Sequence, residues 1–267
     1  LLIDIHHIVF DGTSTGILIR ELMDFYQTPE LQLPELPIQY KDVAQWQAGE
    51  SYRERIARQE SFWLDQFSGD IPVLELPYDF TRPRFQSFEG NSETFSIDTA
   101  TAKALEKLAL ENGSTLYMVL LSLFSIHLSR LGNREDIVIG TPTAGRHHPD
   151  TRQMIGMFVN TVAIRTFPAQ HKTVTDFLSE IKENTLSAFD NQDYPYETLV
   201  QQLSLNRDTS RNPLFDVMFS MQNQDFPAVD ISGLTVRPYE YQDSVSKFDL
   251  MLAAAQEHDT IAFQLQY

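Results

Sequence analysis

Cysteine is missing from all 267 residues, which excludes a disulfide framework and a thiolate nucleophile. Long apolar runs are missing too, since none approaches the roughly 18 consecutive residues that a membrane-spanning helix needs. The N-terminus lacks the basic flank and the small-residue cleavage site of a secretory signal. We therefore expect a soluble, cytoplasmic chain whose chemistry depends on other side chains.

Positive charge is scarce, with 20 Lys and Arg against 37 Asp and Glu and a formal net charge of -17. Such a surface repels a phosphate backbone or an anionic membrane at long range. We therefore expect neither nucleic acid nor a membrane as a partner. The GxSxG, P-loop and GxGxxG signatures are also absent, which removes the commonest hydrolase, nucleotidase and dehydrogenase motifs.

Apolar periodicity divides the chain into helices and strands. Residues 1–7 alternate as a strand does, a helix follows up to Pro29, and 40–67 is helical. Prolines and a glycine between 71 and 91 predict the main linker. We expect later strands at 94–98, 136–142, 157–166, 214–223, 234–241, 248–257 and 260–267, and helices at 101–112, 117–131 and 173–191. The short connections between the last strands predict a mixed α/β fold whose sheet is partly antiparallel.

The stretch IHHIVFDG at 5–12 predicts a strand, a tight turn and the start of a helix. Alternation along a strand puts His6 and His7 on opposite faces, with His7 on the more apolar one. Imidazole exchanges protons near neutral pH, which is what a general base needs. Asp11 could anchor the loop against a cation from another element, and Gly12 permits a tight backbone turn.

The same residues have blander interpretations. An HxxxD spacing is common, and a histidine there is often a core or turn residue. Two adjacent histidines that point to opposite faces do not readily share one ion, and His147 with His148 repeats that arrangement. We therefore predict no metal site. On spacing alone, a catalytic and a structural His7 both remain open.

HHIVFDG resembles the HHxxxDG motif of the condensation domains of nonribosomal peptide synthetases, a branch of the acyltransferase superfamily that includes chloramphenicol acetyltransferase. Further motifs of this family follow in order along the chain. They are YKDVAQWQ at 40–47, IGTPTAGRHHPDTRQMIGMFVNTVAIR at 139–165, NPLFDVMFSMQN at 212–223 and SKFDLML at 246–252. The resemblance covers nearly the whole chain.

The resemblance implies two chloramphenicol acetyltransferase-like lobes, of which mostly the C-terminal one is present. Residues 1–80 would be the end of the N-terminal lobe plus linker helices, and 81–267 the C-terminal lobe, truncated at its end. Apolar segments at both chain ends agree with this, so we expect a fragment that lacks the first part of the N-terminal lobe and is inactive alone.

The implied reaction is amide formation between a peptidyl or aminoacyl thioester donor and an aminoacyl thioester acceptor. Carrier domains upstream and downstream would deliver both substrates on phosphopantetheine arms, and an adenylation domain would lie next to them. The resemblance implies no directly bound cofactor. Alternatives are an epimerization domain of the same superfamily and an inactive module that docks carrier domains.

The resemblance also assigns roles to residues. His7 would remove a proton from the attacking amine or position that amine. For His6, strand parity rather than the resemblance predicts a structural part, because it faces away from His7. Asp11 would hold the loop through an ion pair with Arg146 rather than transfer a proton, and a surface position is the alternative for Arg146.

Polar residues in the later motifs are further candidates. Asn160, Ser220 and Asn223 fall on strands that resemble those facing the junction between the lobes, where a hydroxyl or amide could donate to an oxyanion. Strand packing is the alternative for all three. Tyr40 and Trp46 match a motif, but we expect them to be aromatic anchors first.

Overall fold

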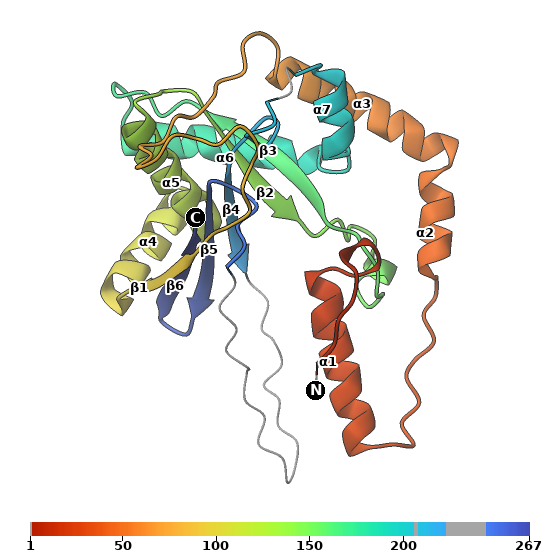
Figure 1. The fold of residues 1–267 in the computed structure, drawn as a ribbon. Coiled ribbons are helices and arrows are strands. Elements are labelled where there is room, and N and C mark those ends of the chain that lie inside the picture. The colour runs from red at the N-terminus through yellow and green to blue at the C-terminus, as the bar shows by residue number, and fades with distance from the viewer. Residues whose placement is uncertain (1, 206–207, 223–243) are drawn as a thin grey trace. The chain divides into compact units, whose positions relative to one another are not determined.

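A computed structural model of the chain describes residues 2–205, 208–222 and 244–267 (Figure 1). The strand expected at 234–241 and the candidate residue Asn223 lie outside these residues. The described chain forms two compact units. Unit 1 contains 2–58 and 144–160, and unit 2 contains the rest.

Unit 1 is built from helices and connecting segments. A 3-10 turn at His7–Val9 leads into α1 (Gly12–Gln27), and α2 (Tyr40–Gln47) precedes α3 (Glu50–Gln66), which continues into unit 2. The two helical stretches expected at 40–67 are confirmed. In the 144–160 segment, a second 3-10 turn spans Pro149–Thr151.

The strand expected at 1–7 is wrong for the residues described. Residues 2–6 pair with no strand in the described chain, and a local turn follows instead. The backbone N–H of Ile8 donates to Nδ1 of His6 at 3.1 Å, and the N–H of Val9 donates to the carbonyl of His6 at 3.2 Å. Strand parity therefore does not separate the two histidines.

Unit 2 is a mixed sheet covered by helices. Its described strands form a six-stranded sheet in the order β1-β6-β5-β4-β2-β3. The strands are β1 (Ser92–Ile97), β2 (Ile137–Thr143), β3 (Asn160–Thr166), β4 (Val217–Gln222), β5 (Leu250–Glu257) and β6 (Thr260–Gln266). β4 runs parallel to β2 and β5, and β6 runs antiparallel to β1 and β5. The expected mixed α/β architecture is confirmed.

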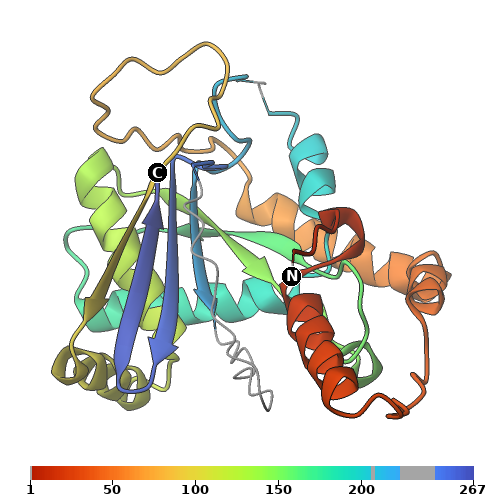
Figure 2. The same ribbon diagram turned by 60° about the horizontal axis from the view of Figure 1, so that its bottom comes forward.

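Helices cover one face of this sheet. They are α4 (Thr99–Glu111), α5 (Leu116–Gly132) and α6 (Val174–Asp190). A further helix of unit 2, α7 (Tyr196–Gln202), lies apart from these three (Figure 1). Figures 1 and 2 show α4, α5 and α6 on the same side of the strands. α5 is apolar almost all round and contacts α4, α6 and β2. Its Leu121 and Leu128 are completely buried. Within the described residues, no single helix is long and apolar enough to cross a membrane.

Candidate functional site

The HHIVFDG loop ends by capping α1. Asp11 is the N-cap residue, and its Oδ1 accepts a hydrogen bond from the backbone N–H of Ser14 at 2.8 Å. An aspartate here also suits the positive end of the helix dipole. His6 and His7 precede this cap on the exposed 3-10 turn. The local sequence thus places both histidines just before a rigid helix start.

Arg146 meets Asp11 in a buried ion pair. The Nη2 of Arg146 lies 2.9 Å from Oδ1 and 3.1 Å from Oδ2 of Asp11. The two side chains are only 5% and 0% exposed. The other terminal nitrogen, Nη1, donates to the carbonyls of Thr151 and Met154. The structure therefore brings together the two residues expected to pair, and it holds the arginine at several points.

Ser14 is a member of this cluster that the sequence analysis missed. Its fully buried hydroxyl donates to Oδ1 of Asp11 at 2.8 Å and accepts from the backbone N–H of Gly156 at 3.0 Å. Arg146 Nη2 also lies 3.0 Å from this hydroxyl. Ser14 thus ties the first turn of α1 to the 144–160 segment. Its position three residues after an N-cap aspartate was the signal that could have pointed to it.

An aromatic layer packs beside the ion pair. The guanidinium of Arg146 lies 4.3 Å from the ring centroid of Phe158, in cation–π geometry. Tyr40 meets Phe158 edge to face at 5.2 Å, and its hydroxyl donates to the carbonyl of Met157 at 2.8 Å. Tyr40 is therefore an aromatic anchor of unit 1.

The glycine that this site requires is Gly145 rather than Gly12. Gly12 is the first residue of α1 and has no positive φ, so the tight turn expected of it is wrong. Gly145 has φ +63°, and a Cβ there would lie 1.9 Å from the carbonyl oxygen of Phe158. Only a residue without a side chain lets Arg146 and Phe158 approach in this way.

The carboxyl group of Asp11 is held in its charged form. Burial pushes its pKa up, but hydrogen bonds from Ser14, Arg146 and the Phe158 backbone N–H outweigh that effect. The net pKa lies below the ordinary value of 3.8. A group that stays ionised at neutral pH is suited to anchoring a cation and poorly suited to exchanging protons.

The remaining candidates lie elsewhere. Ser220 is in β4 of unit 2, 6% exposed, and its hydroxyl has no hydrogen-bond partner in the described part of the chain. Asn160 is the half-buried first residue of β3. Burying a hydroxyl without a hydrogen-bond partner costs free energy. Among the candidates, Ser220 therefore has a hydroxyl that could gain a hydrogen bond from a ligand.

The chain resembles known proteins over its whole length. A family model described as the condensation domain matches residues 1–267. Tyrocidine synthase 3 of Brevibacillus parabrevis is 49% identical over 266 residues, which are 100% of this chain and 4% of that protein. Surfactin synthase subunit 1 of Bacillus subtilis (strain 168) is 47% identical over 267 residues, which are 100% of this chain and 7% of that protein. The chain thus spans a small part of these relatives.

Solved structures share the fold. The complex of the X-domain and OxyB from teicoplanin biosynthesis matches with a TM-score of 0.84 at 24% identity, covering 98% of this chain and 60% of that one. A four-domain nonribosomal peptide synthetase bound to AMP and glycine matches with a TM-score of 0.81 at 24% identity, covering 98% of this chain and 21% of that one.

Proposed function

The chain belongs to the condensation domain family and has its chloramphenicol acetyltransferase-like fold, and from this premise we propose that it serves amide-bond formation in nonribosomal peptide synthesis. The observation that carries this proposal is the complete HHxxxDG loop, held rigid by the Asp11–Arg146 ion pair while His7 stays exposed. Close relatives named as synthases of tyrocidine and surfactin support the same reaction class.

In the proposed reaction, the amine of an aminoacyl thioester attacks the carbonyl carbon of a second thioester. A C–N bond forms, a C–S bond breaks, and the amine loses a proton as the thiolate leaves and is protonated. No nucleotide or metal takes part in this step. The protein holds the amine close to the thioester carbonyl carbon, accepts or directs one proton, and stabilises the developing oxyanion.

His7 is the residue to which we assign the proton or the positioning of the amine. An imidazole can accept a proton near neutral pH, and the short 3-10 turn fixes its backbone just before α1. His6 is assigned a structural part, because its Nδ1 already accepts a hydrogen bond from the N–H of Ile8. Asp11 and Arg146 hold the loop and are assigned no proton transfer.

Ser220 is the preferred donor to the oxyanion or to the substrate carbonyl. Its buried hydroxyl, without a partner in the described residues, is free to donate to a ligand. Asn160 remains a second candidate, and Asn223 stays a prediction from the sequence motif alone. A preorganised donor of this kind gains strength in a site that excludes water.

The proposal includes partners and location. Upstream and downstream carrier domains would bring both substrates on phosphopantetheine arms, beside an adenylation domain and the N-terminal lobe, in the cytoplasm. The division of the chain into 1–80 and 81–267 stays a prediction. Because the HHxxxDG motif is complete, an inactive docking module is the weaker alternative, and no observation favours an epimerization domain.

The test is His7→Ala in the full-length protein. Carrier-to-carrier peptide transfer should fall by about 10²–10⁴-fold, the usual contribution of a general base, while the melting temperature stays near that of the wild type. His127→Ala, an exposed histidine on α5, is the matched control and should keep full activity. Undiminished product formation by His7→Ala would overturn the catalytic assignment.

A further inference from the structure

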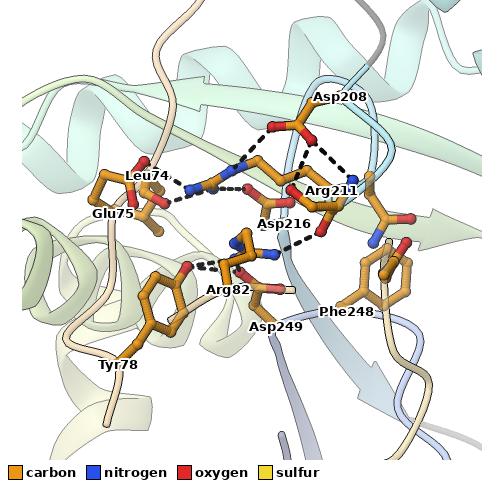
Figure 3. A network of polar contacts seen from close by, with 12 residues as sticks. Leu74, Glu75, Tyr78, Arg82, Asp208, Arg211, Asp216, Phe248 and Asp249 are labelled. Carbon is orange, nitrogen blue, oxygen red and sulfur yellow. Dashed lines mark hydrogen bonds and ion pairs between the residues drawn. The ribbon is translucent and has the colours of Figure 1, made fainter. Parts of the chain in front are cut away.

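A second buried ionic cluster lies in unit 2 and uses the 71–91 linker (Figure 3). We call it the entry cluster and define it as Arg82, Arg211, Asp216 and Asp249. Arg82 is paired with Asp249, and Nη1 of Arg211 lies 2.7 Å from Oδ2 of Asp216. The side chains of all four are between 6% and 17% exposed. The cluster joins the linker to the segments just before β4 and β5.

Flanking residues extend the entry cluster. Tyr78 donates from its hydroxyl to Oδ2 of Asp249 at 2.9 Å, and Nη2 of Arg211 lies 2.7 Å from Oε1 of Glu75. Figure 3 shows Asp216 between the two arginines, with Glu75 beside Arg211 and with Tyr78 and Asp249 beside Arg82. The sequence predicted only a connector here, but the linker supplies charged partners to both strands.

Hydrogen bonds to backbone carbonyls join the linker to the segments before β4 and β5. Nη1 of Arg82 donates to the carbonyl of Ser210 at 2.8 Å, and the N–H of Gln86 donates to the carbonyl of Thr209 at 2.9 Å. The N–H of Asp249 donates to the carbonyl of Asp216 at 2.9 Å, which links the starts of β4 and β5 directly. The start of β4 is therefore fixed from two sides.

The buried charges of the entry cluster contribute little to stability, because their desolvation is only partly compensated. Oδ1 of Asp216 and Nε of Arg82 are buried without a partner in the described residues, and burying charge is costly when its hydrogen bonds are incomplete. Leu214, two residues before Asp216, has φ +73°, a conformation that persists only where its surroundings impose it. We therefore expect the cluster to add little to the free energy of unfolding. Its effect is to hold the start of β4 in one position.

The geometry of β4 connects this position to Ser220. Phe219 packs against Tyr117 and Phe124 of α5, so the residues of the other parity face away from that helix. Continuing this parity, Asp216 and Ser220 lie on the same face, about 13 Å apart along the strand at about 3.3 Å per residue. In the parallel pair of strands, Ser220 lies opposite Ala253. A shift of the strand start would carry Ser220 with it.

We propose that the entry cluster is a positioning device for Ser220, through which the 71–91 linker sets where the hydroxyl meets the substrate. This inference rests on the proposed function, in which Ser220 donates to the reacting carbonyl. Arg82 and Arg211 are positioning residues in this scheme, because they act on Ser220 through β4.

A double-mutant cycle in the full-length protein tests this inference. Arg82→Lys keeps the charge but loses the fork that spans Ser210 and Asp249. It should lower kcat by about ten- to a hundredfold, as a displacement near 1 Å does, and leave KM nearly unchanged. Ser220→Ala should lower kcat as well, and the double variant should be no slower than Ser220→Ala. Arg84→Lys, an exposed neighbour in the same linker, is the matched control and should be unchanged.

Additive losses in the cycle would mean that the cluster does not act through Ser220 and would overturn the inference. A Ser220→Ala variant with the wild-type rate would overturn it too, while the reaction itself would stand. Amide hydrogen exchange of Val217–Gln222 gives a readout that is independent of activity. Faster exchange in Arg82→Lys than in Arg84→Lys supports positioning even if the proposed reaction fails, and unchanged exchange contradicts positioning whatever the kinetics show.

Discussion

Asp11 in unit 1 and Asp216 in unit 2 are both buried aspartates paired with an arginine, yet their carboxylates are satisfied differently. Both oxygens of Asp11 accept hydrogen bonds, from Ser14, Arg146 and the Phe158 backbone. Asp216 accepts one at Oδ2 from Arg211, and its Oδ1 has no partner in the described residues. The difference lies in how many donors surround each charge.

The two pKa values move in opposite directions for this reason. For Asp11, burial raises the pKa, but the hydrogen bonds together lower it by more, so that the net value lies below 3.8. For Asp216, burial raises the pKa, the bond from Arg211 lowers it, the negative charge of Asp249 raises it, and the net value lies above 3.8. Burial beside an arginine therefore does not by itself make a favourable ion pair, because the remaining lone pairs decide the balance.

Asp11→Asn in the intact domain should have the largest effect. It leaves the charge of Arg146 buried without its counter-charge, and breaking a buried pair in this way costs about 3–5 kcal/mol. Urea-induced unfolding measures the loss. A loss below about 1 kcal/mol, the level of an exposed ion pair, would remove the anchoring role of Asp11.

Gly145→Ala tests whether the close approach of the 144–160 segment supplies the donors to Asp11. A Cβ would clash with the Phe158 carbonyl oxygen at a positive φ, so we expect a loss of about 1–3 kcal/mol from overpacking. Gly16→Ala is the control, since nothing lies within 4 Å of its Cβ position. Replacing that helical glycine should instead add about 0.5–1 kcal/mol. Equal effects at the two glycines would contradict the packing described here.

Asp216→Asn should have the smallest effect on the free energy of unfolding, about 1 kcal/mol or less. The amide removes a charge whose burial is incompletely compensated, and Arg211 retains Glu75 at 2.7 Å. The same urea experiment measures it beside Asp11→Asn. A loss as large as that of Asp11→Asn would show that the two pairs are equivalent and would break the comparison.

Features set by neighbouring residues could be predicted from the sequence, whereas features set by distant residues could not. The start of α1 after Asp11 was predictable because an N-cap acts on residues three positions away. The strand at 1–7 was not, since alternating side chains describe a strand only where another strand supplies its hydrogen bonds. Helix α7 was missed because seven residues are too few to show a helical period.

The site shows the same limit. Arg146 was identified as the partner of Asp11 only through the family motif, because 135 positions separate the two in the chain. The position of Ser14 after the N-cap could have pointed to its bond with Asp11, but nothing local reveals its contact with Gly156, 142 positions away. Gly145 and Phe158 carry no local pattern that reveals their contact. Arg82 and Asp249 are 167 positions apart, and a proline-rich linker gives no sign that one of its arginines is buried.

The most direct test of the account is the pH dependence of unfolding for wild type, Asp11→Asn and Asp216→Asn between about pH 3 and pH 7, because a shifted pKa appears as a slope in stability. Asp11 has a lowered folded pKa, so its contribution is present above 3.8 and is lost as the pH falls through the folded value. The advantage of wild type over Asp11→Asn should therefore grow as the pH rises to about 3.8 and then stay level. Asp216 has a raised folded pKa, so the free energy of unfolding of wild type should fall relative to that of Asp216→Asn as the pH rises above 3.8. Opposite slopes are the predicted result, and slopes of the same sign for both variants would contradict it.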